Sequence, residues 1–187
     1  MAPLFVALVH FPVLNRRGDT IASAITTMDL HDLARSCCTY DVPVCYIVTP
    51  LKDQQGLALR LTGHWRERIG KELAPDRAEA LERVCVIESI EAAAGKILER
   101  TGLRPVVWAT SARAAAGALA HAEARESLAA SGRPHLLLFG TGWGLAPEVI
   151  SAADALIEPI RGQNGYNHLS VRCAASILMD RLVGRRD

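Results

Sequence analysis

The stretch that decides the fold is Leu136-Leu-Leu-Phe-Gly-Thr-Gly-Trp-Gly-Leu145, an apolar run that ends in a glycine-rich turn. An apolar run without polar alternation is typical of a strand that is buried on both faces. A second such run, Ala155 to Ile160, opens into the polar segment Arg161 to Ser170, and an apolar helix pattern follows. Two strand-ending loops rich in glycine and small polar side chains are typical of a sheet that binds a small polar cofactor. The two loops together indicate an enzyme.

Short aliphatic runs alternate with helical patterns along the rest of the chain. We expect strands at Leu4 to Phe11, Val44 to Thr49, Val84 to Ile87, Val106 to Ala109, Leu136 to Phe139 and Leu156 to Ile160. We expect helices at Met28 to Tyr40, Gln54 to Ile69, Ile90 to Thr101, Ala112 to Ala130, Pro147 to Ala153 and Leu169 to Val183, with a short extra helix started by the capping-box spacing of Asp76 and Glu79. This alternation predicts a single α/β domain with a mostly parallel sheet of six strands flanked by helices.

The composition fits one well-cored globular domain, because 50% of the 187 residues are hydrophobic and 22% are charged. The formal net charge of +1 argues against a generically basic nucleic-acid binder but permits a local basic patch. Five cysteines without a metal-type spacing predict reduced thiols, no metal site and a cytoplasmic protein. The first apolar run precedes its charges, and no run reaches about 18 apolar residues, which argues against a signal peptide and a membrane span.

The glycine loop has more than one interpretation. Gly140, Gly142 and Gly144 permit positive φ and a close approach of the backbone to a ligand, and Pro147 suits a helix start. The loop could equally be a tight turn that binds nothing. A Rossmann dinucleotide site is a rival, but its third glycine would fall at Leu145, and that motif belongs after the first strand. A P-loop is excluded because the Walker lysine is missing.

The second loop places amide, imidazole and hydroxyl groups at a predicted helix start. Asn167, His168 and Ser170 lie where backbone N–H donors point outward. Asn167 or Ser170 could equally be a helix N-cap without a ligand. His168 is a poor candidate for a metal ligand because no second His or Cys lies at a ligand spacing.

The first predicted helix has a polar arc opposite its apolar residues. Asp29, Asp32 and Arg35 lie on this arc. Asp32 and Arg35, three positions apart, could form a solvated ion pair without further function.

Together these segments resemble the SPOUT superfamily, the α/β-knotted, SpoU-TrmD-like RNA methyltransferases that use S-adenosylmethionine. Asp29 to Val48 resembles the first motif, with Asp29 where the family commonly has asparagine and Arg35 six positions later. Phe139 to Leu145 resembles the second motif, although its usual glutamate is missing. Glu158 to Ala175 resembles the third motif with a slightly longer loop. The resemblance is closest to a compact bacterial group without an added RNA-binding domain.

The resemblance implies a deep trefoil knot over roughly positions 105–183, a fold feature that periodicity alone never proposes. It implies S-adenosylmethionine as the cofactor, held mainly by the backbone of three loops, with Leu145, Ile160 and Leu169 as apolar walls for adenine. The residues that the resemblance assigns to cofactor binding are Ala109, Thr110, Ser111, Gly140, Thr141, Gly142, Gly144, Leu145, Glu158, Pro159, Ile160, Gly162, Asn167, His168, Leu169 and Ser170.

The resemblance also implies the roles of several charged residues. Arg35 and Asp29 are the candidate catalytic pair, because a planar, permanently charged guanidinium suits recognition of RNA oxygens near the acceptor. Arg161 is a second candidate substrate contact. From their charge alone, Arg16 and Arg17 are also candidate substrate contacts in a local phosphate-binding patch, although each could equally be a plain solvated charge. In family members the corresponding arginine can reach the partner's cofactor site, so the resemblance implies a homodimer packed through the first and last helices.

The implied function is methylation of tRNA or ribosomal RNA, at a ribose hydroxyl or at a base nitrogen. Two alternatives remain open at this point. One is a knotted module that binds S-adenosylmethionine or a nucleotide without turnover, and the other is a nucleotide-dependent oxidoreductase. For each reading we expect a cytoplasmic protein without a membrane segment or a metal.

Overall fold

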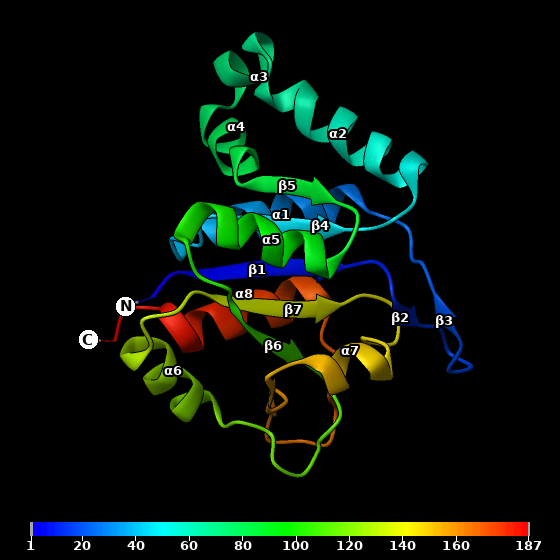
Figure 1. The fold of residues 1–187 in the computed structure, drawn as a ribbon. Coiled ribbons are helices and arrows are strands. Elements are labelled where there is room, and N and C mark those ends of the chain that lie inside the picture. Colours follow the sequence, from blue (N-terminus) through cyan, green and yellow to red (C-terminus); the bar gives the residue numbers. More distant parts are fainter. Residues whose placement is uncertain (1, 187) are drawn as a thin grey trace.

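The computed structural model describes residues 2–186, and at positions 68 and 69 it describes the backbone alone. Met1 and Asp187, the ends of the expected 1–187 domain, therefore lie outside the described residues, as does the side chain of Ile69. Within the described residues, six strands form one parallel sheet in the order β5-β4-β1-β7-β6-β8 (Figure 1). The predicted α/β class and its mostly parallel sheet are confirmed.

The central strands of this sheet are buried almost throughout. The strands are β1 (Leu4–Val9), β4 (Cys45–Val48), β5 (Val84–Ile87), β6 (Val106–Thr110), β7 (His135–Gly140) and β8 (Ala155–Ile157). Successive side chains of a strand point to opposite faces, so Val6 and Leu8 of β1 join one core cluster while Phe5 and Ala7 join the other. Burial on both faces explains why these strands are aliphatic without alternation.

Helices cover both faces of the sheet. They are α1 (Thr27–Thr39), α2 (Lys52–Arg66), α3 (Arg68–Leu73), α4 (Pro75–Glu82), α5 (Ile90–Thr101), α6 (His121–Ala130), α7 (Pro147–Ala152) and α8 (Val171–Val183). α1, α6 and α8 share one core cluster, and α5 and α7 share the other; Figure 1 shows α5 and α7 in front of the sheet and α1 and α8 behind it. No helix among the described residues is long and apolar enough to cross a bilayer.

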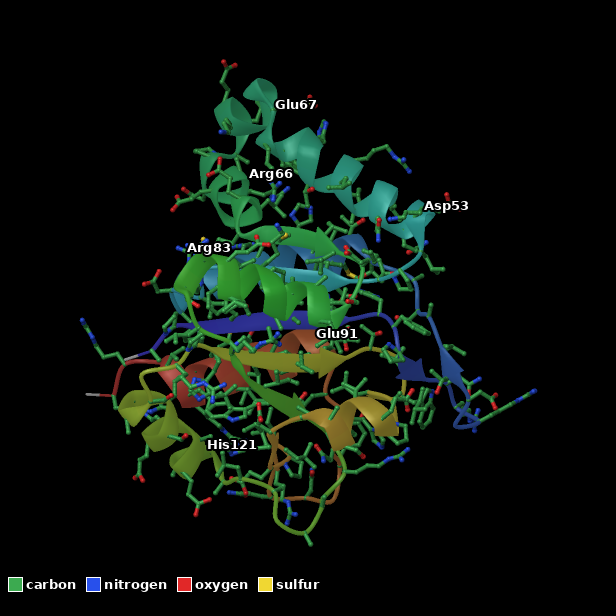
Figure 2. The ribbon with its side chains drawn as sticks, viewed as in Figure 1. Asp53, Arg66, Glu67, Arg83, Glu91 and His121 are labelled. Carbon is green, nitrogen blue, oxygen red and sulfur yellow. The ribbon has the colours of Figure 1, made fainter. Side chains whose placement is uncertain are left out.

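The α2–α4 group lies beside β5 at one edge of the sheet (Figure 1). Arg66 joins this group to the sheet, because its guanidinium donates to the carbonyl oxygen of Leu81 and, at 2.6 Å, to that of Val84. Figure 2 shows Arg66 between α2 and β5. The group therefore extends the domain on the side away from β8.

The strand order reverses beside β1. From β1 the chain runs outward through β4 to β5, and it then crosses the sheet to build the other half from β6, β7 and β8. In open parallel sheets, ligands bind at the carboxyl ends of the strands where the order reverses. The topology thus directs attention to the ends of β1 and β7, where Val9 and Gly140 are register partners.

The expected helix Ala112 to Ala130 is wrong in its first part, since α6 begins at His121 and residues 112–120 form a loop. The alanine-rich composition favours a helix. However, the N–H of Leu119 donates to the Leu156 carbonyl at 2.7 Å, and its carbonyl accepts from the N–H of Glu158 at 2.9 Å. These hydrogen bonds to the end of β8 require extended backbone, so tertiary structure overrides local propensity.

The expected helix Gln54 to Ile69 is also wrong at its end, because α2 stops at Arg66 and α3 starts after an extended residue, Glu67, with ψ of 164°. The capping-box interpretation of Asp76 is wrong as well. Ala74 is the N-cap of α4 and makes no side-chain cap bond; Pro75 occupies the first turn. Proline suits that position because its missing N–H would have no helical partner there.

Two further elements differ from expectation at the ends of strands. The strand expected over Leu4 to Phe11 stops at Val9, and a short antiparallel hairpin of β2 (Val13–Leu14) and β3 (Thr20–Ile21) follows it. The strand expected to end at Ile160 stops at Ile157. The residues beyond β8, Glu158 to Ile160, line a cavity instead of extending the sheet.

Candidate active site

A cavity of about 1080 Å³ lies at the carboxyl ends of β6, β7 and β8. Its walls come from segments far apart in the sequence: residues 110–113 at and after the end of β6, 139–145 at the end of β7, and, after β8, residues 158–160, 165 and 167–171. The hairpin side of the molecule contributes Leu14 and the residues just before α1. Both loops that the sequence singles out therefore face one cavity.

The glycine loop after β7 folds back on itself. A Cβ at Gly140 would lie 2.4 Å from the backbone nitrogen of Leu145, which is closer than real Cβ contacts come, so glycine is required there for the loop's own backbone. Gly142 and Gly144 adopt positive φ of 59° and 104°. The sequence-based expectation of positive φ is thus correct for two of the three glycines, and Gly140 serves a close approach instead.

The β2–β3 hairpin holds this loop from outside. The N–H of Trp143 donates to the Leu14 carbonyl at 2.9 Å, and the N–H of Leu14 donates to the Gly144 carbonyl at 2.9 Å. The N–H of Ala146 donates to the Pro12 carbonyl at 3.2 Å. The loop therefore behaves as an added, antiparallel partner of β2, which fixes its backbone at the mouth of the cavity.

A chain of polar side chains lies behind the glycine loop. His10 Nδ1 is 3.0 Å from Ser23 Oγ, Ser23 Oγ is hydrogen-bonded to Thr141 Oγ1, and Thr141 Oγ1 donates to the Val9 carbonyl at 3.1 Å. Burial lowers the pKa of His10 to about 4, and the charge of Asp29 opposes this shift only in part. His10 is therefore neutral at physiological pH, and the chain joins β1, β7 and the segment before α1 without a net charge.

The loop after β8 is held by its own side chains. Glu158 Oε1 accepts from the backbone N–H of His121 at 2.9 Å and lies 2.9 Å from His121 Nδ1, at the start of α6 (Figure 2). Burial, followed by the nearby guanidinium of Arg181, lowers the pKa of His121. Asn167 Nδ2 donates to the Ala112 carbonyl at 2.6 Å, and Ser170 Oγ accepts from the N–H of Cys173 at 3.3 Å. Glu158, Asn167 and Ser170 thus each have a structural partner while facing the cavity.

The structure brings most of the predicted cofactor residues to this cavity. Those that line it are Thr110, Ser111, Gly140, Thr141, Gly142, Gly144, Leu145, Glu158, Pro159, Ile160, Asn167, His168, Leu169 and Ser170. Ala109 is buried in the core and does not line the cavity. Gly162 does not line it either, and Gly165 stands there instead.

The proposed substrate arginines lie away from the cavity wall. Arg161 is exposed on the loop after β8, and Arg16 and Arg17 are exposed in the turn of the hairpin. That turn is closed by Asn15, whose Oδ1 accepts from the N–H of Arg17 at 2.7 Å. The cavity has a different arginine in its wall, Arg113.

The two candidate catalytic residues are separated by the fold. Asp29 lines the cavity and its side chain is 13% exposed, with the guanidinium of Arg172 at 3.4 Å. Arg35 lines a second hollow of about 510 Å³ between α1 and α8, together with Asp32 and Arg172. Asp32 pairs with Arg172 at 3.1 Å, so its ion-pair partner is in α8 and not, as the i,i+3 spacing suggested, Arg35.

Several lining residues were missed from the sequence. Ser23, Thr26 and Leu14 precede α1 and carry no motif, and they reach the cavity only because the hairpin folds over the end of β7. Trp143 lies in the glycine loop and Arg113 in the helix expected over Ala112 to Ala130. An aromatic ring and a guanidinium are side chains that often bind ligands, and this was the signal that could have identified them. Within the described residues, no group of three or more His, Cys, Asp or Glu could hold a metal ion.

Relatives of known sequence match almost the whole chain. A tRNA (guanine-N(1)-)-methyltransferase of Nitratidesulfovibrio vulgaris is 48% identical over 181 residues, which is 97% of this chain and 42% of that protein. A protein of the same name from Oleidesulfovibrio alaskensis is 45% identical with the same coverage. An uncharacterised protein of Aquifex aeolicus is 34% identical over 97% of this chain and 89% of its own length. The chain thus spans less than half the length of the two relatives that carry an activity in their names.

Solved structures share the fold at low sequence identity. TrmJ of Z. mobilis has a TM-score of 0.66 and 14% identity, covering 100% of this chain and 71% of that one. The SpoU methyltransferase AviRb of Streptomyces viridochromogenes, solved with AdoMet, has a TM-score of 0.61 and 13% identity over 97% of this chain and 57% of its own. The model of the family described as SAM-dependent RNA methyltransferase matches residues 3–184. Because this match spans nearly every residue of the fold and of the cavity, the chain belongs to the family of SAM-dependent RNA methyltransferases.

Proposed function

We propose that this chain is an S-adenosylmethionine-dependent RNA methyltransferase and that its cavity holds both the cofactor and the acceptor nucleotide. The observation that carries the proposal is the convergence of three strand-ending loops on one cavity at the carboxyl ends of β6, β7 and β8, next to the point where the strand order reverses. Two of these loops, after β7 and after β8, contain the second and third motifs that resemble the family, and the loop after β6 is the remaining loop that the resemblance assigns to the cofactor. A module that binds the cofactor without turnover needs the same loops. The methyltransferase and the binding module therefore differ in activity and not in fold.

The cavity fits the cofactor in size and chemistry. A volume of about 1080 Å³ lies just above the range of about 300–1,000 Å³ that is usual for ligand sites. Leu145, Ile160 and Leu169 supply apolar wall for an adenine ring, and the hydroxyls of Thr110 and Ser111 are polar groups on the opposite loop. When bound, S-adenosylmethionine supplies an electrophilic methyl group on a sulfonium. The loops would hold the acceptor in line with that methyl group and exclude water.

Asp29 is the candidate that takes the proton from the acceptor. Its carboxylate lies in the cavity wall, largely shielded from solvent, and Arg172 stands beside it. A carboxylate within reach of an acceptor N–H or O–H can accept the proton that methylation displaces. Arg172 positions this carboxylate from the opposite helix.

We place Arg35 in the partner's site of a homodimer. Arg35 is exposed and faces the hollow between α1 and α8, not the cavity of its own chain. A dimer packed through α1 and α8 would bring it to the second subunit, as the family resemblance implies. The exposed arginines Arg16, Arg17 and Arg161 would then contact RNA phosphates around the site.

The trefoil knot is likewise part of the proposal. β8 is at the edge of the sheet, and α8 packs with α1 and α6 on one face of it, so residues 158–170 lead the chain from the edge of the sheet to that face. This segment touches the loop after β6 through Asn167 and Ala112, and Leu119 bonds to residues on both sides of Ile157. Threading of 158–183 through that loop accounts for these contacts.

We also propose that the protein works in the cytoplasm. Its five cysteines are free thiols, which is typical of a reducing compartment.

We propose tRNA as the first substrate to test. The relatives named tRNA (guanine-N(1)-)-methyltransferase match this chain over only 42% of their length, so more than half of each lies outside the match. The guanine N1 position is therefore one acceptor to test among others.

The proposed function is tested by incorporation of labelled methyl groups into total RNA from cells that lack the gene. Calorimetry measures the binding of S-adenosylmethionine and of NAD alongside. Binding of S-adenosylmethionine without incorporation supports the module instead, and binding of NAD alone refutes both.

A further inference from the structure

One tryptophan in the cavity wall has a role that cofactor binding does not explain. Trp143 is 52% exposed, whereas Trp108 is 2% exposed in the core. Its backbone is nevertheless fixed: the N–H of Trp143 and the carbonyl of Gly144 both bond to Leu14 at 2.9 Å. The loop therefore presents a large aromatic ring to solvent from a rigid base, where a ring can act as a stacking surface.

The position of Trp143 along its loop separates it from the cofactor wall. Thr141 is 8% exposed and Leu145 is 3% exposed, so the residues two positions before and two positions after Trp143 are buried. The adenine wall that we assign to Leu145 is therefore deep, and Trp143 stands at the mouth. An acceptor must enter the cavity from the mouth, because the cofactor's methyl group has to face it.

The groups around the mouth of the cavity suit a nucleobase. Besides Trp143, the exposed residue Arg113 lines the cavity from the loop after β6. Unpaired RNA bases are bound by stacking on aromatic rings and on arginine guanidinium planes. Enzymes that modify a base first extrude it from its helix into such a pocket.

We propose that Trp143 is the stacking platform for the extruded acceptor base, so that the methylated atom belongs to a base and not to a ribose. A ribose hydroxyl is already displayed in the minor groove of an RNA helix, whereas a base atom becomes accessible to an enzyme only when the base is extruded and held outside its helix. This inference rests on the proposed RNA methyltransferase activity and specifies its acceptor. It makes Trp143 a substrate-binding residue with no role in holding the cofactor.

The test compares Trp143→Ala, Trp143→Phe and the control Leu73→Ala, since Leu73 is an exposed apolar residue that does not line the cavity. Calorimetry measures S-adenosylmethionine affinity, and labelled methyl transfer to RNA gives KM and kcat. Trp143→Ala should raise the KM for RNA by about 10-fold or more, as expected from loss of one stacked base, and leave cofactor affinity within about 2-fold. Trp143→Phe, which keeps an aromatic face, should recover most of the loss, and Leu73→Ala should match the wild type.

The product nucleoside decides the acceptor atom. Mass analysis of digested RNA should place the methyl group on a base. A 2′-O-methyl nucleoside, or an unchanged KM for Trp143→Ala, overturns the inference while the methyltransferase activity stands. Wild-type protein that methylates no RNA at all overturns the proposed function, and the inference with it.

Discussion

The guanidinium of Arg172 lies 3.4 Å from the carboxylate of Asp29, which links the start of the last helix to the start of the first. The same guanidinium lies 3.1 Å from the carboxylate of Asp32. Asp29 lines the cavity and Asp32 lines the hollow that contains Arg35. One arginine therefore connects the proposed cofactor site to the proposed dimer face.

Replacing Arg172 should impair activity more than stability. Arg172→Ala leaves Asp29 without its partner, so we expect kcat to fall by about 10-fold or more through misplacement of the carboxylate. Because the pair is partly exposed, the free energy of unfolding should fall by only about 1 kcal/mol. Labelled methyl transfer and urea unfolding measure the two effects. The control is Arg186→Ala, which removes an ion pair with Asp180 whose length is 3.1 Å. This pair does not line the cavity. Equal loss of activity in both variants would contradict the role of Arg172.

Adding a methyl group at Gly140 should disrupt the glycine loop. Gly140→Ala forces a Cβ against the backbone of Leu145, so we expect S-adenosylmethionine binding to be lost and the protein to be destabilised by about 1–3 kcal/mol. Gly132→Ala is the matched control, because nothing lies within 4 Å of a Cβ there. Calorimetry measures the affinity of the two variants for S-adenosylmethionine, and thermal unfolding measures their stability. Normal cofactor affinity in Gly140→Ala would contradict the claim that the cofactor site requires glycine at this position.

Buried His10 should make the protein less stable in acid. Its pKa is about 4 in the folded state against 6.5 for the free side chain, so the unfolded chain takes up a proton first as the pH falls. The free energy of unfolding should therefore drop between pH 6.5 and pH 4, by a total of about 3 kcal/mol from this residue, and change no further from it below pH 4. The pKa values of His31, His121 and His135 are also lowered and act in the same direction.

Urea unfolding across this pH range isolates the contribution of His10 when the wild type is compared with His10→Gln. The variant should be less stable at pH 7 but should lose less stability on acidification. Parallel pH profiles for the two proteins would show that His10 does not titrate as proposed.

Arg125 should stabilise the end of the last helix. Its guanidinium donates to the carbonyl of Arg181 at 3.1 Å and to that of Gly184 at 2.8 Å, which satisfies acceptors that a helix end otherwise leaves free. Arg125→Met should lower the free energy of unfolding by about 1–3 kcal/mol, since it leaves partly buried carbonyls unpaired. Lys96→Ala, which removes an exposed pair with Glu99, should cost far less. Chemical denaturation compares the two, and similar losses would argue against the helix-end role.

A subunit-mixing experiment tests the placement of Arg35. If Arg35 acts in the partner's cavity, Arg35→Ala and Gly140→Ala are each inactive alone but complement each other in a mixed dimer. Random exchange of equal amounts should restore about a quarter of wild-type activity, because half of the dimers are mixed and each has one intact site. No recovery after verified exchange would place Arg35 in the site of its own subunit.

The parts of the fold that depend on local pattern could be predicted from the sequence. All six strands of the main sheet, the glycine loop after β7 and the Ser170 helix start follow from aliphatic runs and turn residues close together in the chain. The helix expected from Ala112 was wrong because its first residues bond to a strand that comes later in the sequence. Amino-acid composition gives the helix propensity of these residues, but it does not show that hydrogen bonds to a distant strand will compete with helix formation.

The missed part of the site depends on contacts between distant residues. Ser23 and Thr141 are 118 positions apart, and their hydrogen bond exists only because β1 and β7 are neighbours in the sheet. Nothing in the residues around Ser23 distinguishes it from an ordinary loop serine. The roles of Leu14 and Arg113 in the cavity wall are likewise set by topology, which a single sequence does not specify.

The cavity draws one wall from residues 158–171, which come late in the chain, and another from the hairpin near its beginning. During synthesis, the ribosome still covers the later wall after the earlier one has emerged. A nascent chain can therefore bury much of its sheet while it has no complete place for a methyl donor. Cofactor capture should thus follow the synthesis of these later residues, and premature termination anywhere before α8 should yield a product that cannot retain the donor.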